Sequence, residues 1–88
     1  MGSVLHITKS KYIVVKLVNA EDLPPLGAEI VDANNEVIGR LIDIIGPVTQ
    51  PYAIVRPLKP SVVSFIKPSM FLFYRILKAK KGAKRGRS

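Results

Sequence analysis

The sequence predicts an all-β domain in which about six short strands close into a small antiparallel barrel. Three observations support this fold class. The chain has 88 residues, which is room for one domain. Its apolar runs are short, rich in β-branched residues and separated by turn-forming residues. No long segment free of proline and glycine repeats apolar residues at helical spacing. Closure into a barrel would leave no strand edge exposed.

The first two strands are expected at residues 3–8 and 11–18. The first is a short apolar run that ends at the polar pair Lys9-Ser10. The second reads Lys-Tyr-Ile-Val-Val-Lys-Leu-Val, and this density of β-branched residues favours a strand. Residues 19–27 contain acidic residues, two prolines and a glycine, so we expect a loop there.

The middle of the chain predicts a hairpin. Residues 28–32 form a short strand, and residues 33–36 contain two asparagines, which tolerate the positive φ of a tight turn. Residues 37–45 form the longest expected strand. Gly39 lies inside it and indicates either a bulge or a close approach of another backbone.

Two further strands are expected in the last third of the chain. Residues 52–56 form a short strand between two prolines, and residues 70–77 form the last one. Residues 61–67 also lie between prolines, and their sequence is compatible with a turn or two of helix or with another strand.

The positive charge is concentrated at the C-terminal end. The net charge is +8, yet residues 1–74 hold seven bases against six acids, and residues 75–88 hold seven bases and no acid. We therefore divide the chain into a barrel domain, residues 1–77, and a basic disordered tail, residues 78–88. The tail has no aromatic residue for stacking on bases, so it is either a solubilising end or a weak, non-specific RNA contact. Its basic residues are Lys78, Lys80, Lys81, Lys84, Arg85 and Arg87.

The residue inventory argues against an enzyme. The chain has no cysteine, so neither a disulfide nor a thiolate metal site is expected. His6 is the single histidine and lies in an expected strand, and the six acids are scattered over turns and strands. We find no nucleophile elbow, metal-ligand cluster or phosphate-binding glycine loop, and expect no cofactor and no small-molecule substrate. No apolar run reaches the length of a membrane helix, so no membrane partner is expected.

The connection between the strands at 37–45 and 52–56 is unusually apolar and contains two prolines. Proline cannot donate to a strand ladder, so this backbone is not ordinary sheet interior. Two interpretations remain open, a tight corner of the barrel core or a surface patch that binds a protein partner. We call this segment the apolar corner and define it by Ile45, Gly46, Pro47, Val48, Pro51 and Tyr52.

Residues 39–57 carry a resemblance to a known family. Gly39 is followed by an apolar-Asp-apolar stretch, Gly46-Pro47-Val48, Pro51-Tyr52 and a short strand that ends in Arg56-Pro57. This pattern resembles the small glycine/arginine-rich-domain subunit of H/ACA ribonucleoproteins. The resemblance covers residues 3–77, and residues 26–32 fit it as well. The flank contains a single Arg-Gly-Arg, so the chain is similar to the compact archaeal form.

The resemblance implies a six-stranded split barrel of the reductase/isomerase/elongation-factor type. It implies a non-catalytic accessory subunit that binds the pseudouridine synthase of the guide-RNA complex and aids substrate loading and product release. It also implies a role in rRNA modification and ribosome biogenesis, with contact to guide or ribosomal RNA through the complex. The corresponding location is the cytoplasm of an archaeon, or the nucleolus of a eukaryotic cell.

The alternative is a barrel that binds RNA directly, such as a ribosomal or translation-factor module. Such a protein needs a basic, aromatic face, whereas an accessory subunit needs its apolar corner. The aromatic residues of the last strand sit among apolar residues with Arg75 as the nearby base, which predicts that they belong to the core. These residues are Phe71, Phe73 and Tyr74.

Overall fold

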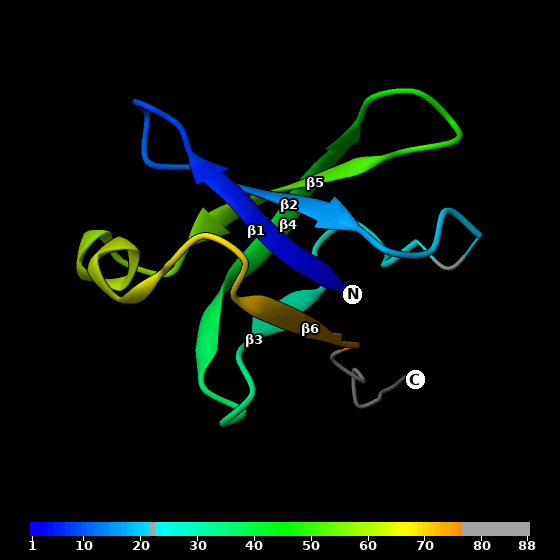
Figure 1. Cartoon of the computed structure of the whole chain (residues 1–88). Helices are drawn as coiled ribbons and strands as arrows, with labels where there is room; N and C mark the ends of the chain where they lie inside the picture. The colour runs from blue at the N-terminus through cyan, green and yellow to red at the C-terminus, as the bar shows by residue number, and fades with distance from the viewer. Residues whose placement is uncertain (22, 77–88) are drawn as a thin grey trace.

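The computed structural model describes residues 1–21 and 23–76, and these form a closed, six-stranded antiparallel barrel (Figure 1). This confirms the predicted fold class. The elements are β1 (Gly2–Ile7), β2 (Ile13–Leu17), β3 (Glu29–Val31), β4 (Val37–Ile45), β5 (Tyr52–Pro57), the 3-10 helix η1 (Pro60–Phe65) and β6 (Phe71–Arg75).

The strands follow the order β1-β2-β5-β4-β3-β6 around the barrel, and every neighbouring pair is antiparallel. The pairing of β1 with β6 closes the circle, with Gly2 opposite Leu72 and Ser3 opposite Phe71. Within this closed sheet each strand has a hydrogen-bonded neighbour on both sides, which removes the exposed edges that favour aggregation.

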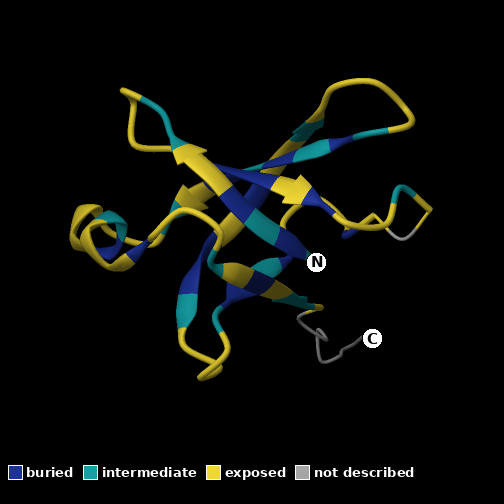
Figure 2. Ribbon diagram, viewed as in Figure 1, coloured by how far each residue is buried: buried dark blue, intermediate teal, exposed yellow. Residues whose placement is uncertain are grey.

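Side chains of β5 alternate between the barrel interior and its surface, whereas in β2 all residues except Lys16 are buried (Figure 2). The largest fully buried side chains are aliphatic and come from five strands. Burying each one stabilises the fold by about 1.5–3 kcal/mol relative to leaving it in water. These residues are Ile13, Val15, Ile30, Leu41, Val55 and Leu72.

Residues 61–67, whose sequence is compatible with either a helix or a strand, contain most of the 3-10 helix η1. Pro60 stands at its start, where the missing N–H is not needed, and Pro68 follows its end. Val62 and Ile66 join the core cluster, whereas Phe65 is 71% exposed. The helix therefore covers the core with one side and leaves an aromatic ring in solvent.

Gly39 marks a close approach of β4 to β5, and it also lies beside a register shift in the pairing of β4 with β3, between Val37 and Gly39. A Cβ atom there would collide with the carbonyl oxygen of Arg56 and would lie 2.9 Å from the Cα of Pro57. The register shift of β4 against β5 falls further along, between Leu41 and Asp43. Only glycine lets β4 and β5 approach so closely at this point.

The β3–β4 turn forms as the asparagines predict. Asn35 has φ 64°, and the Oδ1 atom of Asp32 accepts hydrogen bonds from the N–H groups of Asn34, at 2.8 Å, and Glu36, at 2.9 Å. The aspartate thus holds the turn by local side-chain to backbone bonds.

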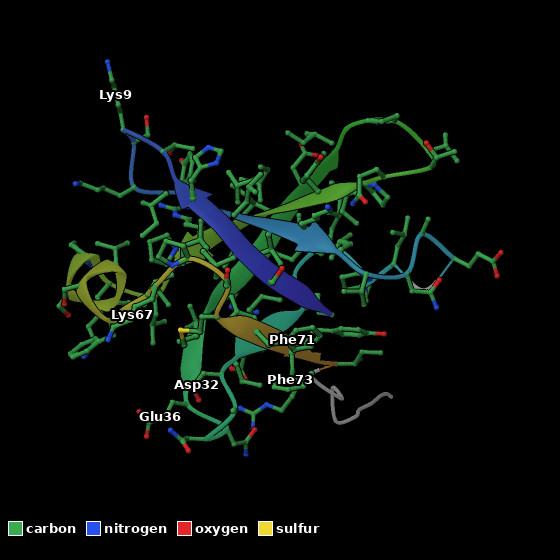
Figure 3. The ribbon with its side chains drawn as sticks, viewed as in Figure 1. Lys9, Asp32, Glu36, Lys67, Phe71 and Phe73 are labelled. Carbon is green, nitrogen blue, oxygen red and sulfur yellow. The ribbon has the colours of Figure 1, made fainter. Side chains whose placement is uncertain are left out.

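The prediction that the aromatic residues of the last strand lie in the core is wrong for two of them. Phe71 and Phe73 are 40% and 41% exposed and point outward from β6, with ring centroids 5.1 Å apart (Figure 3). Tyr74 does pack against the core. Alternation along β6 explains the split, because Leu72 takes the inward position and its two neighbours must then face outward.

Candidate functional site

The apolar corner is the loop that joins β4 to β5 and projects from the barrel at the upper right of Figure 1. Ile45 ends β4 and pairs directly with Tyr52, the first residue of β5. Ile45 is 47% exposed, Val48 is 89% exposed and Tyr52 is half-buried. Pro51 is the one buried member of the corner. The interpretation as packed core therefore fails for most of this segment, which lies on the surface.

Gly46 gives the corner its shape. Its φ of +96° lies in the region that favours glycine. A Cβ atom on Gly46 would lie 2.9 Å from Cδ2 of Tyr52, so the tyrosine ring packs directly over the glycine. The N–H of Gln50 donates to the carbonyl of Pro47 at 3.0 Å and closes the turn.

Gln50 ties the corner to the end of β2. Its Nε2 atom donates to the carbonyl oxygens of Leu17, at 3.2 Å, and Pro51, at 3.1 Å. The N–H of Leu17 also donates to the Pro51 carbonyl at 3.3 Å. Sequence reasoning missed Gln50, because a glutamine by itself does not signal such a role.

The corner exposes mainly apolar area. Two charged residues adjoin it: Lys16, the register partner of Tyr52, and Asp43, whose Oδ1 accepts the N–H of Ile44. In residues 1–21 and 23–76, no three histidine, cysteine, aspartate or glutamate side chains come together as metal ligands. In the same part of the chain, no helix has both the length and the apolarity to cross a membrane. The arrangement is suited to binding a complementary apolar surface.

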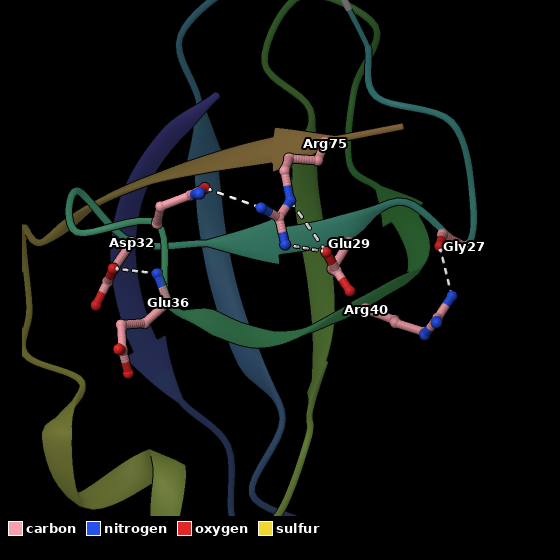
Figure 4. Close-up of polar contacts among 7 residues, drawn as sticks. Gly27, Glu29, Asp32, Glu36, Arg40 and Arg75 are labelled. Atoms are coloured by element: carbon pink, nitrogen blue, oxygen red, sulfur yellow. Dashed lines mark hydrogen bonds and ion pairs between the residues drawn. The ribbon is translucent and has the colours of Figure 1, made fainter. Parts of the chain in front are cut away.

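A polar cluster that the sequence did not reveal joins β3 to β6 (Figure 4). Arg75 lies opposite Glu29 and makes an ion pair with its Oε1 atom, with the Nε hydrogen bond at 3.0 Å. Its Nη1 atom donates to Oδ1 of Asn35 at 3.1 Å. In the sequence Arg75 begins the basic C-terminal end, but its charge is engaged by Glu29 and Asn35 of the barrel.

The six predicted RNA-contact residues of the tail are outside the described residues, so their role stays a prediction. They are Lys78, Lys80, Lys81, Lys84, Arg85 and Arg87.

Comparison with protein families decides between the classes of small β-barrel. The family model described as the Gar1/Naf1 RNA binding region matches residues 1–81. The chain belongs to this family. The match spans the whole barrel and confirms the resemblance drawn from residues 39–57, so the chain is a Gar1-type subunit of H/ACA ribonucleoproteins. No curated protein matched the chain.

Membership in the Gar1/Naf1 family fits an accessory role in the H/ACA ribonucleoprotein and places the chain in an RNA-binding context. The family is one of ribonucleoprotein accessory proteins and not a known catalytic family.

Proposed function

We propose that this Gar1-type chain is the accessory subunit that docks on the pseudouridine synthase of the H/ACA complex through its apolar corner. Docked there, it aids the loading of substrate RNA and the release of product. The observation that carries the proposal is the exposure of Ile45 and Val48 on a loop whose backbone is held by Gly46, Gln50 and Pro51.

A held loop favours association because little conformational entropy is lost when it binds. Pro47 and Pro51 restrict φ at both sides of the turn, and Gln50 bonds the loop to β2. The apolar side chains are therefore presented in one arrangement before the partner arrives. The removal of this apolar area from water would supply the main favourable free energy of docking.

Titration of the purified synthase with the full chain tests the proposal. Val48→Asp should weaken binding by more than about 2 kcal/mol, because it places an unpaired carboxylate in a desolvated contact. Phe65→Asp is the matched control: it makes the same change at an exposed apolar residue, on η1 and outside the corner. Both variants should melt at the wild-type temperature. Equal synthase affinity for Val48→Asp and wild type would contradict docking through the corner.

The effect on turnover is measured separately. If the subunit aids product release, adding it to the synthase and guide RNA should raise the multiple-turnover rate more than the single-turnover rate. At a concentration at which the wild-type subunit saturates the synthase, the Val48→Asp variant should no longer raise the multiple-turnover rate more than the single-turnover rate. Equal stimulation of both rates would point to a step other than release.

A further inference from the structure

A group of cations lies at the end of the barrel opposite the apolar corner. Strand β5 begins at the corner with Tyr52 and reaches this group at Arg56, about 13 Å along the strand. Lys9 projects from the β1–β2 turn, away from the barrel (Figure 3). We call this group the basic cluster; it consists of Lys9, Lys11, Tyr12, Arg40, Arg56 and Lys59.

Two arginines of the basic cluster face each other across the sheet. Arg40 of β4 is the direct register partner of Arg56 of β5, and both side chains are exposed. Like charges placed directly opposite each other destabilise a sheet. Arg40 donates one hydrogen bond, to the carbonyl of Gly27 at 3.3 Å. Neither arginine makes an ion pair with a carboxylate of the described residues. Within the described residues, no carboxylate therefore offsets the repulsion between these two arginines.

Lys11 occupies a backbone conformation that glycine or asparagine would adopt at lower cost. Its φ is 70°, and its N–H donates to the carbonyl of Thr8 at 2.9 Å. Tyr12 is held by two more bonds to Thr8, one from its N–H to Oγ1 at 3.1 Å and one from the Thr8 N–H to its carbonyl at 2.8 Å. These bonds hold the backbone of the turn that carries Lys11 and Tyr12 beside β5.

These side chains share a hollow. Lys11, Tyr12, Arg56 and Lys59 line a depression of about 420 Å³, and no carboxylate lines it. Tyr12 is 37% exposed, and the pairing of Ile13 with Val55 sets it beside Arg56. An exposed aromatic ring among cations suits a polyanion that also has flat rings to stack, which single-stranded nucleic acid has and an acidic protein surface lacks.

We propose that the basic cluster binds a single-stranded RNA segment, with phosphates at Arg40, Arg56, Lys11 and Lys59 and a base on Tyr12. This rests on the proposed function, since it assigns the RNA side of the same assembly. Residues 1–74 balance to +1, but the cluster gathers five of their seven cations at one end, whereas Glu29 is engaged by Arg75. The average charge therefore conceals a local positive field.

The test measures the affinity of the full chain for a labelled, unstructured oligouridine over a range of salt concentrations. Arg56→Gln should weaken binding several-fold and reduce the steepness of log K against log salt by about 0.7, the loss of one single-strand phosphate contact. Lys16→Gln is the control, because it removes one exposed charge from the adjacent strand beside the corner. It should change affinity less than twofold. The Arg56→Gln variant should melt at the wild-type temperature or above, since the repulsion from Arg40 is relieved.

A second pair of variants separates stacking from charge. Tyr12→Ala should weaken oligouridine binding about tenfold, whereas Tyr12→Phe, which keeps the ring, should bind like wild type. If Arg56→Gln and Lys16→Gln weaken binding equally, the effect is one of total charge and the proposal fails. It also fails if Arg56→Gln loses synthase affinity while its RNA affinity is unchanged, because the cluster then binds protein. Absence of synthase binding by wild type would overturn the proposed function and leave the RNA measurement intact.

Discussion

The two ends of strand β5 differ in what they expose and in how the backbone supports it. At the first end, Tyr52 belongs to a corner of apolar side chains held by glycine, proline and a glutamine that bonds to β2. At the other end, Arg56 lies opposite Arg40, and the backbone of Lys11 has a positive φ. The first end exposes apolar area to water, and the second places like charges together.

Both ends depart from what the stability of the isolated barrel favours, and the core between them does not. Ala53 and Val55, the inward residues of the same strand, are fully buried among aliphatic neighbours. Residues that break the rules of a stable fold while the core obeys them are where function is expected. The difference between the ends then indicates two kinds of partner, an apolar protein surface and a polyanion.

The largest expected effect is on RNA affinity when the tail is removed, which separates the contribution of the tail from that of the barrel. Removing residues 78–88 deletes six bases and should lower the steepness of log K against log salt for oligouridine by up to about four. The truncated chain should retain a weaker, salt-dependent affinity that Arg56→Gln reduces further. Affinity measurements at several salt concentrations check this. A truncated chain with no measurable RNA affinity would assign all RNA contact to the tail.

The next prediction concerns the close approach that sets Arg56 opposite Arg40. Gly39→Val should destabilise the barrel by about 3 kcal/mol or more, because the new side chain collides with the backbone of Arg56 and Pro57. Gly27→Ala is the control: φ is +87° there but nothing lies within 4 Å of the added Cβ, so about 1–2 kcal/mol is expected. Urea denaturation measures both. Similar losses in the two variants would show that the approach at Gly39 can relax.

A third prediction compares a tyrosine-to-alanine substitution at the apolar corner with the same substitution at the basic cluster. Tyr52→Ala should weaken synthase binding by about 2 kcal/mol, the scale of an interface hot spot, and should cost the free barrel less stability than that. Tyr12→Ala, at the basic cluster, should leave synthase affinity unchanged. Titrations beside thermal melts measure both quantities. Equal synthase affinities for the two variants would remove Tyr52 from the interface.

The smallest expected effect concerns the cluster that joins β3 to β6. Arg75→Ala should destabilise the barrel by about 1 kcal/mol, because the ion pair with Glu29 is partly exposed and weakened by solvent. Arg75→Lys should recover part of this, since it keeps the charge but loses the planar set of donors. Thermal melts at low and high salt measure the change. An Arg75→Ala variant as stable as wild type would show that strand pairing alone holds β6 against β3.

The sequence by itself determined the number of strands, the positions of the turns and the apolar corner as a segment. These depend on local properties: β-branched runs favour strands, asparagine tolerates positive φ at residue 35, and proline at residues 47 and 51 interrupts a ladder. They also sufficed for the resemblance that the family match confirms.

Only the tertiary structure decided which side chains meet and which face water. Phe71 and Phe73 face outward. Arg40 lies opposite Arg56, and Arg75 forms an ion pair with Glu29. Each of these depends on the register between strands that are distant in sequence, and a shift of one residue would reverse the face of every side chain on a strand. Register follows from packing the whole core at once, so no local pattern could reveal the basic cluster or show that the corner lies in solvent.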